Sequence, residues 1–292
     1  MTNIENVLTN FKRKNYTEAL QELNKILIND PSSFEKLNLR GVILQLLDRP
    51  GEARQDWIKA SNINNKYFDP YFNLGNSFMD EKNYDEAELY YRKAANCQPE
   101  NFKIYYQLGF LFMKKNELKK AYDFFNKSKS YNNKFAPTYY NIGVILNNLN
   151  KKNETINYLI KAIEINPEYT DAFFLLGVTY REIKKFNLSK KYFLEAFKLN
   201  PDYPYLKGAI RFIKNTLCEW NDYEKELIEL ENDIKNKKKV VTPWQGLSLF
   251  SSPSVQLENT ILFTEFEKKN SYEITTKQKI NLAYISANFC EH

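Results

Sequence analysis

A glycine recurs at one fixed spacing through the middle of the chain, and this spacing constrains the fold more than any other feature. Five copies stand in phase: Gly41, Gly75, Gly109, Gly143 and Gly177. Small side chains occupy two further positions of each interval, one at Ala53, Ala87, Ala121, Thr155 and Ser189, the other at Ala60, Ala94, Ser128, Ala162 and Ala196. A constant period of about 34 residues is typical of chains that stack one supersecondary unit on the next. The sequence therefore predicts a repeat array.

Two further columns indicate what each unit contains. A large apolar side chain follows each glycine at a constant distance, at Trp57, Tyr91, Phe125, Leu159 and Phe193. A proline stands near the end of three of the intervals, again in phase, at Pro99, Pro167 and Pro201. An earlier copy lacks the glycine but keeps Ala19 and Pro31. The pattern resembles the tetratricopeptide repeat, whose unit is a pair of antiparallel helices.

The physical chemistry of the columns agrees with this resemblance. We expect the small residues to lie where two helices cross closely, because a bulky side chain there would overpack the contact. The large residues are expected to fill the gap between helix pairs. Proline would open the turn into the next unit, since it cannot continue the preceding helix. Stacked units would bury apolar faces that one pair leaves uncovered.

The predicted fold class is all-α, a tetratricopeptide right-handed superhelix. Only 8 glycines occur among 292 residues, which leaves few of the tight turns that an all-β fold needs. Six repeats are predicted within residues 1–203, at 1–33, 34–67, 68–101, 102–135, 136–169 and 170–203. A capping helix pair is predicted at 204–236, where Arg211 occupies the glycine column.

Composition excludes several classes of partner and site. The formal net charge is +6, but apart from Lys235 and Lys237–Lys239 the lysines are scattered, so no nucleic-acid partner is predicted. Cys97, Cys218 and Cys290 have neither metal-ligand nor redox-motif spacing, and no metal site is predicted. The first residues lack the apolar core of a signal peptide, and no apolar run could span a bilayer. We therefore expect a cytoplasmic protein without a membrane partner.

The concave groove of such an array is the predicted binding site. The sixth position of each first helix reads Leu39, Asn73, Gln107, Asn141 and Leu175. A carboxamide both donates and accepts hydrogen bonds, so Asn73, Gln107 and Asn141 are candidates for holding the backbone of an acceptor protein or peptide. The alternative is that these side chains only face solvent. The fifth position reads Asn38, Phe72, Tyr106, Tyr140 and Phe174, and without lysine it does not favour an acidic tail.

The last part of the chain, 237–292, is predicted to be a linker followed by the beginning of another domain. Ser252 and Pro253 favour the start of a helix that runs to about Lys268. Residues 279–286 alternate in polarity and are rich in strand formers, so they predict a strand. The fold prediction thus includes a short C-terminal α/β stub.

Three motifs in this part resemble the protein O-GlcNAc transferase family. Cys218–Tyr223 is similar to the Cys-Asp-Trp-x-Asp-Tyr segment that follows the repeats in that family, and Ser252–Leu257 matches its Ser-Pro-x-x-Gln-Leu helix. Residues 283–292 are similar to its Gly-Tyr-Val-Ser-x-Asp-Phe-x-x-His strand, although Ala283 replaces the glycine and Asn288 the aspartate. The resemblance implies repeats followed by the first strand of a two-lobed glycosyltransferase domain.

That resemblance also implies an activity. The family transfers N-acetylglucosamine from UDP-GlcNAc to Ser or Thr of proteins, with inversion and without a metal. By motif, His292 matches the histidine beside the acceptor and is the candidate catalytic residue. The donor-binding lobe is not among these residues, so no cofactor is expected in this chain and the 292 residues are expected to be inactive alone. A donor such as GDP-fucose and a free-standing repeat adaptor without catalytic activity remain alternatives, and the oligomeric state stays open.

Overall fold

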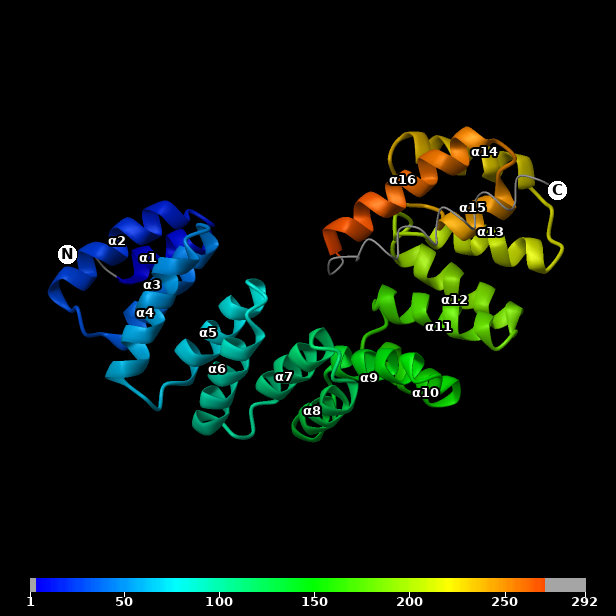
Figure 1. The fold of residues 1–292 in the computed structure, drawn as a ribbon. Coiled ribbons are helices and arrows are strands. Elements are labelled where there is room, and N and C mark those ends of the chain that lie inside the picture. Colours follow the sequence, from blue (N-terminus) through cyan, green and yellow to red (C-terminus); the bar gives the residue numbers. More distant parts are fainter. Residues whose placement is uncertain (1–3, 271–292) are drawn as a thin grey trace. The chain divides into compact units, whose positions relative to one another are not determined.

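The computed structural model describes residues 4–270, which form helices joined by turns (Figure 1). They fall into two compact units, Met1–Lys151 and Lys152–His292. The N-terminal unit holds α1 (Ile4–Lys12), α2 (Tyr16–Asn29), α3 (Phe34–Leu46), α4 (Pro50–Ile63), α5 (Phe68–Asp80), α6 (Tyr84–Cys97), α7 (Phe102–Lys114), α8 (Leu118–Tyr131) and α9 (Ala136–Asn148). The C-terminal unit holds α10 (Lys152–Ile165), α11 (Thr170–Glu182), α12 (Phe186–Leu199), α13 (Leu206–Thr216), α14 (Tyr223–Lys235), α15 (Pro243–Leu249) and α16 (Pro253–Asn270).

Within each unit, successive helices from α1 to α9 and from α10 to α14 pack against each other in chain order. No strand occurs among the described residues, so the predicted all-helical array is confirmed there. The predicted C-terminal strand at 279–286, with Ala283 and Asn288, lies outside the described residues. No helix in the described part of the chain is long and apolar enough to cross a membrane.

The turn inside each helix pair repeats with the same period as the glycines. One residue per turn has a positive φ of 57–62°, at Lys14, Asp48, Lys82, Asn116, Asn150, Lys184 and Cys218. The next amide then donates to a carbonyl in the last turn of the preceding helix, as in Asn83 N to Phe78 O at 2.9 Å. This left-handed residue with its six-to-one bond ends a helix and satisfies its last carbonyls. Cys218 continues the series, so the terminal pair turns in the same way as the repeats.

In four of the helix pairs, the glycine of the column lies directly against the large side chain of the partner helix. A Cβ built on Gly75 would lie 2.5 Å from the ring of Tyr91, and one on Gly109 would lie 2.7 Å from the ring of Phe125. Trp57 and Phe193 crowd Gly41 and Gly177 in the same way. The large column thus closes on the glycine of its own pair.

The other small columns are fully buried. Where alanine gives way to serine, the hydroxyl finds a backbone carbonyl: Ser128 Oγ donates to Phe102 O at 3.0 Å, and Ser189 Oγ donates to Gly177 O at 2.7 Å. A buried hydroxyl without a partner would destabilise the fold. Serine is tolerated in place of alanine at these positions because a carbonyl of the neighbouring helix lies close enough to accept the hydrogen bond.

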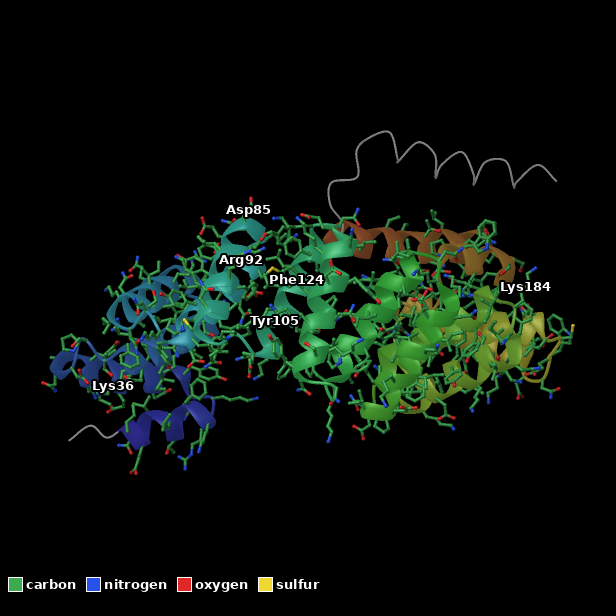
Figure 2. All side chains as sticks on the ribbon, turned by 90° about the horizontal axis from the view of Figure 1, so that it is seen from below. Lys36, Asp85, Arg92, Tyr105, Phe124 and Lys184 are labelled. Atoms are coloured by element: carbon green, nitrogen blue, oxygen red, sulfur yellow. The ribbon has the colours of Figure 1, made fainter. Side chains whose placement is uncertain are left out.

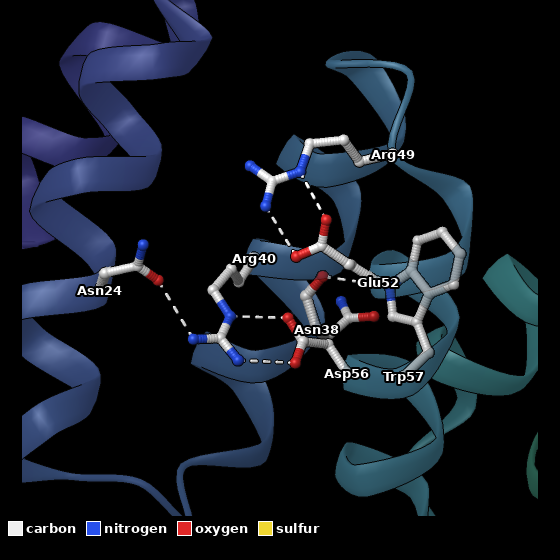
Figure 3. Close-up of polar contacts among 7 residues, drawn as sticks. All are labelled: Asn24, Asn38, Arg40, Arg49, Glu52, Asp56 and Trp57. Carbon is white, nitrogen blue, oxygen red and sulfur yellow. Dashed lines mark hydrogen bonds and ion pairs between the residues drawn. The ribbon is translucent and has the colours of Figure 1, made fainter.

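An ion pair reinforces the beginning of the array (Figure 3). The Arg40 guanidinium on α3 donates to both carboxylate oxygens of Asp56 on α4, at 2.6 and 2.7 Å, and to Asn24 Oδ1 on α2 at 3.1 Å. Asp56 is only 3% exposed. The hydrogen bonds to this carboxylate raise the pKa of Arg40 above its ordinary value. The bidentate pair joins α3 to α4, and the bond to Asn24 adds α2.

The terminal pair, α13 and α14, is built differently. Arg211 occupies the glycine column and is 1% exposed. Its guanidinium donates to Glu226 Oε2 at 2.8 Å, to Asn215 Oδ1 at 2.9 Å and to Glu219 O at 2.5 Å. It also lies 5.0 Å above the ring of Tyr223. This buried charge is tolerated because the guanidinium has a carboxylate, an amide and a carbonyl as partners.

The start of the predicted linker is packed instead of extended. Val240 and Val241 are 6% and 1% exposed, and they share a core with Leu230 and Ile234 of α14. Lys239 O accepts from Tyr205 N at 2.7 Å, and Val240 O accepts from Gly208 N at 2.9 Å. A capping box between Thr242 and Gln245 then begins α15, a helix that the sequence analysis did not predict.

Candidate functional site

Three first helices of the N-terminal unit carry the candidate carboxamides. Asn73 lies on α5, Gln107 on α7 and Asn141 on α9, each two positions before its glycine column. We call these three side chains the carboxamide ladder. The ladder is uncharged, whereas the second helix α6 carries ion pairs, Asp85 with Lys115 at 2.7 Å and Arg92 with Glu88 at 2.8 Å. Figure 2 labels Asp85 and Arg92 on this helix.

Asn73 is fixed by a neighbouring repeat. Its Nδ2 donates to Asn38 Oδ1 at 3.0 Å, and Asn38 Nδ2 in turn donates to Tyr67 Oη at 3.4 Å. The Phe34 and Tyr67 rings meet edge to face, with centroids 5.0 Å apart. Burial, followed by the Asp69 carboxylate, raises the pKa of Tyr67 to about 12. The phenol therefore stays neutral over the physiological range.

Gln107 is fixed in a similar way. Its Nε2 donates to Asn76 Oδ1 at 3.3 Å, and the same oxygen accepts from Tyr91 Oη at 2.8 Å. Burial raises the pKa of Tyr91, which is fully buried. Asn76 thus connects the core tyrosine of one repeat to the ladder residue of the next.

Asn141 is the most internal member of the ladder. It is 7% exposed, and its Nδ2 donates to Tyr106 Oη at 3.1 Å. Burial raises the pKa of Tyr106, and the bond from Asn141 partly opposes this. The two side chains therefore form an inter-repeat contact, and Asn141 presents less surface to a ligand than Asn73 or Gln107.

Asn73 and Gln107 retain hydrogen-bonding capacity. Both are half-buried, and each uses one amide hydrogen within the protein. No hydrogen bond from another described residue reaches Asn73 Oδ1 or Gln107 Oε1. A carboxamide offers two donors and one carbonyl acceptor, so each side chain can still accept from, and donate to, a ligand.

The aromatic fifth position packs within its own repeats. The ring of Phe72 lies 5.9 Å from that of Tyr91, and Tyr106 lies 5.6 Å from Phe125. The ring of Tyr106 also lies 5.1 Å from that of Phe135, which directly precedes α9. These rings support the helices that carry the ladder.

Cys218–Tyr223 and Ser252–Leu257, two of the three motifs singled out in the sequence, lie in the described part of the chain. Trp220 is 56% exposed and stacks edge-on to Tyr223, with centroids 5.4 Å apart. Gln256 Nε2 donates to Phe250 O at 2.6 Å and so closes the turn between α15 and α16. The candidate catalytic residue His292 lies outside the described residues.

Asn38, Asn76 and Tyr106 complete the polar network, and the sequence analysis did not assign them to the site. Asn76 follows the glycine column, where other repeats carry Val42, Phe110, Val144 and Val178. That column holds no repeated polar signal, so its role follows only from the geometry.

Comparison with known families agrees with this architecture. One family described as TPR repeat matches residues 75–116, and one described as Tetratricopeptide repeat matches 102–135, 136–169 and 170–203. The latter three intervals coincide with predicted units. No curated protein matches the sequence. The chain therefore carries an array of tetratricopeptide repeats.

Solved structures show the same fold at low sequence identity. PilF of Pseudomonas aeruginosa is 20% identical with a TM-score of 0.61, covering 68% of this chain and 90% of that chain. PilW, described as a type IV pilus biogenesis factor, is 15% identical with a TM-score of 0.60, covering 69% and 94%. YrrB, described as a TPR protein with an unusual peptide-binding site, is 21% identical with a TM-score of 0.51, covering 62% and 93%.

Proposed function

We propose that the array is a protein-binding module that holds an extended segment of a partner along the carboxamide ladder. The observation that carries this proposal is the unused donor and acceptor capacity of Asn73 and Gln107. Both side chains are already fixed by bonds to the neighbouring repeat. A ligand would therefore bind without first ordering them, which reduces the entropy lost on binding.

The chemistry of the ladder favours a peptide backbone over charged side chains. Its members are uncharged, and the rings packed beside them are Phe72 and Tyr106. Each residue of an extended peptide, except proline, presents one N–H and one C=O that need partners when water is removed. Carboxamides can satisfy both without regard to the peptide's side chains. We therefore expect tolerance of many sequences.

The finer proposal concerns what the partner is used for. The similarity of Cys218–Tyr223 and Ser252–Leu257 to segments of protein O-GlcNAc transferases supports an acceptor-binding role in such an enzyme. In this proposal the bound segment carries the Ser or Thr that receives N-acetylglucosamine from UDP-GlcNAc, and His292 is a catalytic residue. The competing function is an adaptor that binds proteins without glycosylating them.

A binding experiment tests the first proposal. The probe is a short uncharged peptide rich in Ser and Thr, compared with the same peptide N-methylated at alternate backbone amides. Net hydrogen bonds contribute about 0.5–1.5 kcal/mol each, so Asn73→Ala with Gln107→Ala should weaken binding roughly 5- to 100-fold. Unchanged affinity in this double variant, or equal affinity for the N-methylated peptide, would exclude backbone recognition by the ladder.

The matched control removes two carboxamides elsewhere. Asn96 on α6 and Asn187 on α12 are exposed and make no hydrogen bond through their side chains with other described residues. Asn96→Ala with Asn187→Ala should leave the affinity unchanged. A comparable loss in this control would indicate a general effect of the substitutions.

A second experiment distinguishes the acceptor-binding part of a transferase from an adaptor that only binds proteins. A photo-crosslinking residue at Phe110, which follows Gly109 on α7, would capture partners in the source cells, and mass spectrometry would map the crosslinked segments. The transferase proposal expects N-acetylhexosamine on Ser or Thr in or beside those segments. Crosslinked segments that never carry the sugar would favour the adaptor.

A further inference from the structure

A cavity of about 380 Å³ lies in the C-terminal unit, apart from the ladder. Its walls come from α11, from α13 with the residues before it, and from α15. This volume is at the lower end of the roughly 300–1,000 Å³ typical of ligand pockets. The lining residues that the argument uses are Phe174, Val178, Arg181, Phe212 and Trp244.

Arg181 is the distinctive group in this cavity. Its side chain is half-buried, and its guanidinium carbon lies 6.0 Å from the centre of the Phe212 ring, which also lines the cavity. No other described residue forms an ion pair or hydrogen bond with its guanidinium. Burial lowers the pKa of Arg181, and the Glu182 carboxylate only partly opposes this.

Three other polar residues in the walls, Glu182, Thr242 and Gln245, have partners. Glu182 forms an ion pair with Lys152. Thr242 and Gln245 bond to each other, with Thr242 Oγ1 and Gln245 Oε1 3.0 Å apart. The cavity therefore combines an uncompensated guanidinium with apolar walls.

We propose that this cavity binds the C-terminal carboxylate of a peptide whose last side chain is aromatic or branched aliphatic. A guanidinium presents paired N–H groups that match the two oxygens of a carboxylate. Phe174, Val178 and Trp244 supply the apolar surface for the side chain. The small volume favours a chain end over a segment that passes through. This site is separate from the ladder and goes beyond the function proposed above.

Trp244 provides a direct reporter, because it lines the cavity and is 67% exposed. Trp57 is buried, and Trp220→Phe removes the other exposed indole. The full chain with this substitution would be titrated with acetyl-Gly-Gly-Phe bearing a free carboxylate, with its C-terminal amide, and with acetyl-Asp-Phe-amide. We expect the free acid to shift Trp244 emission and to bind at least 10-fold more tightly than either amide.

Variants assign the effect to the guanidinium. Arg181→Gln should weaken binding of the free acid about 10- to 100-fold, the range for a lost hydrogen bond to a charged group. Arg181→Lys keeps the positive charge but loses the paired N–H groups of the guanidinium. Its affinity for the free acid should lie between those of the wild-type chain and Arg181→Gln. Lys198→Gln removes the same charge from an exposed position on α12 and should have no effect.

Four results would overturn the proposal. One is equal binding of the free acid and its amide, which requires no variant to fold. Another is unchanged affinity in Arg181→Gln that circular dichroism shows to be folded. The third is binding of acetyl-Asp-Phe-amide alone. The fourth is no binding by any probe at about 1 mM, a concentration at which even a weak complex forms. None of these results bears on the ladder.

Discussion

The repeat pair α5/α6 and the terminal pair α13/α14 turn in the same way but pack in opposite ways. Lys82 and Cys218 occupy equivalent left-handed positions in their turns. In the repeat, Gly75 leaves room for Tyr91. In the terminal pair, Arg211 fills the equivalent space and is neutralised by Glu226. The three small columns have become Arg211, Tyr223 and Leu230, and the two helices pack less closely.

This comparison separates the two roles of a repeat unit. The left-handed turn sets the direction of the second helix and does not depend on the interface. The interface between the two helices can contain a glycine, and the helices then pack tightly through apolar side chains. It can also be filled by a charged side chain, which then needs a complete set of partners. The charged solution suits the last pair, since the next element is not another repeat.

The largest loss of stability is expected when the buried ion pair of the terminal pair is removed. Arg211→Ala leaves Glu226 with Lys214 as its remaining partner and opens a void beside Tyr223. Removing one member of a buried ion pair typically destabilises by about 3–5 kcal/mol. Urea denaturation should show a loss of about this size for the C-terminal unit.

A double variant sharpens this result. Arg211→Leu with Glu226→Leu replaces the ion pair by apolar groups, which is often neutral or stabilising. We expect it to recover most of the loss. If it is as unstable as Arg211→Ala, the cap depends on the specific hydrogen bonds to Asn215 and Glu219.

The next effect is expected at the glycine of the repeat. Gly75→Ala places a methyl 2.5 Å from Tyr91, a buried ring that has little room to move. Overpacking of this kind destabilises by about 1–3 kcal/mol, of which the helix propensity of alanine recovers up to about 1. Thermal melting measures the difference.

Gly51 is the matched control, because a Cβ there meets no atom within 4 Å. Gly51→Ala on α4 should stabilise by about 0.4–1 kcal/mol, through helix propensity and the unfolded chain. The interpretation fails if the two substitutions change stability by the same amount.

A third prediction uses the buried phenols of the repeats. Tyr67 has its pKa raised to about 12, and burial raises that of Tyr91 as well. The folded state thus keeps both phenols protonated where the unfolded state has lost the proton. Their contribution is fully present below about pH 10, the ordinary value for tyrosine, and is lost as the pH rises toward 12.

Tyr91→Phe tests this assignment. It loses the bond to Asn76 and about 1 kcal/mol at neutral pH. Its stability should then fall less steeply than that of the wild-type chain between pH 10 and 12. Parallel curves for the two proteins would show that Tyr91 does not control the alkaline transition.

The smallest effect is expected in the shared turn. Lys82 and Cys218 hold positive φ angles of 61° and 57°, a conformation that strains a residue with a Cβ. Lys82→Gly and Cys218→Gly should each stabilise by about 0.5–1 kcal/mol. Asn116→Gly should gain less, because asparagine tolerates this region. Different signs at 82 and 218 would break the claim that the two turns are equivalent.

The helical array could be predicted from the sequence because its cause is periodic. Five glycines recur at one spacing, and at Gly41, Gly75, Gly109 and Gly177 a side chain would block a contact with the partner helix. The left-handed turns could not be predicted, because Lys82, Asn116 and Cys218 share a backbone conformation but no chemistry. The helix α15 was missed although Thr242 and Gln245 carry the capping-box pattern, since the lysines before it suggested a linker.

The candidate site was predictable only in outline. The column of Asn73, Gln107 and Asn141 could be found by its period, but their partners could not. Asn73 bonds to Asn38 of the preceding repeat, and Gln107 bonds to Asn76, whose column holds no other polar residue. The cavity at Arg181 has no repeated signal, because its walls come from three helices of different kinds.

The most direct test of the account observes the ladder during binding. In the ¹⁵N-labelled chain, NMR resolves the side-chain amides of Asn73 and Gln107, which single substitutions would assign. Addition of the uncharged Ser- and Thr-rich peptide should shift both signals and leave that of the exposed Asn96 unchanged. Binding that shifts neither signal would contradict the claim that the ladder holds the peptide backbone.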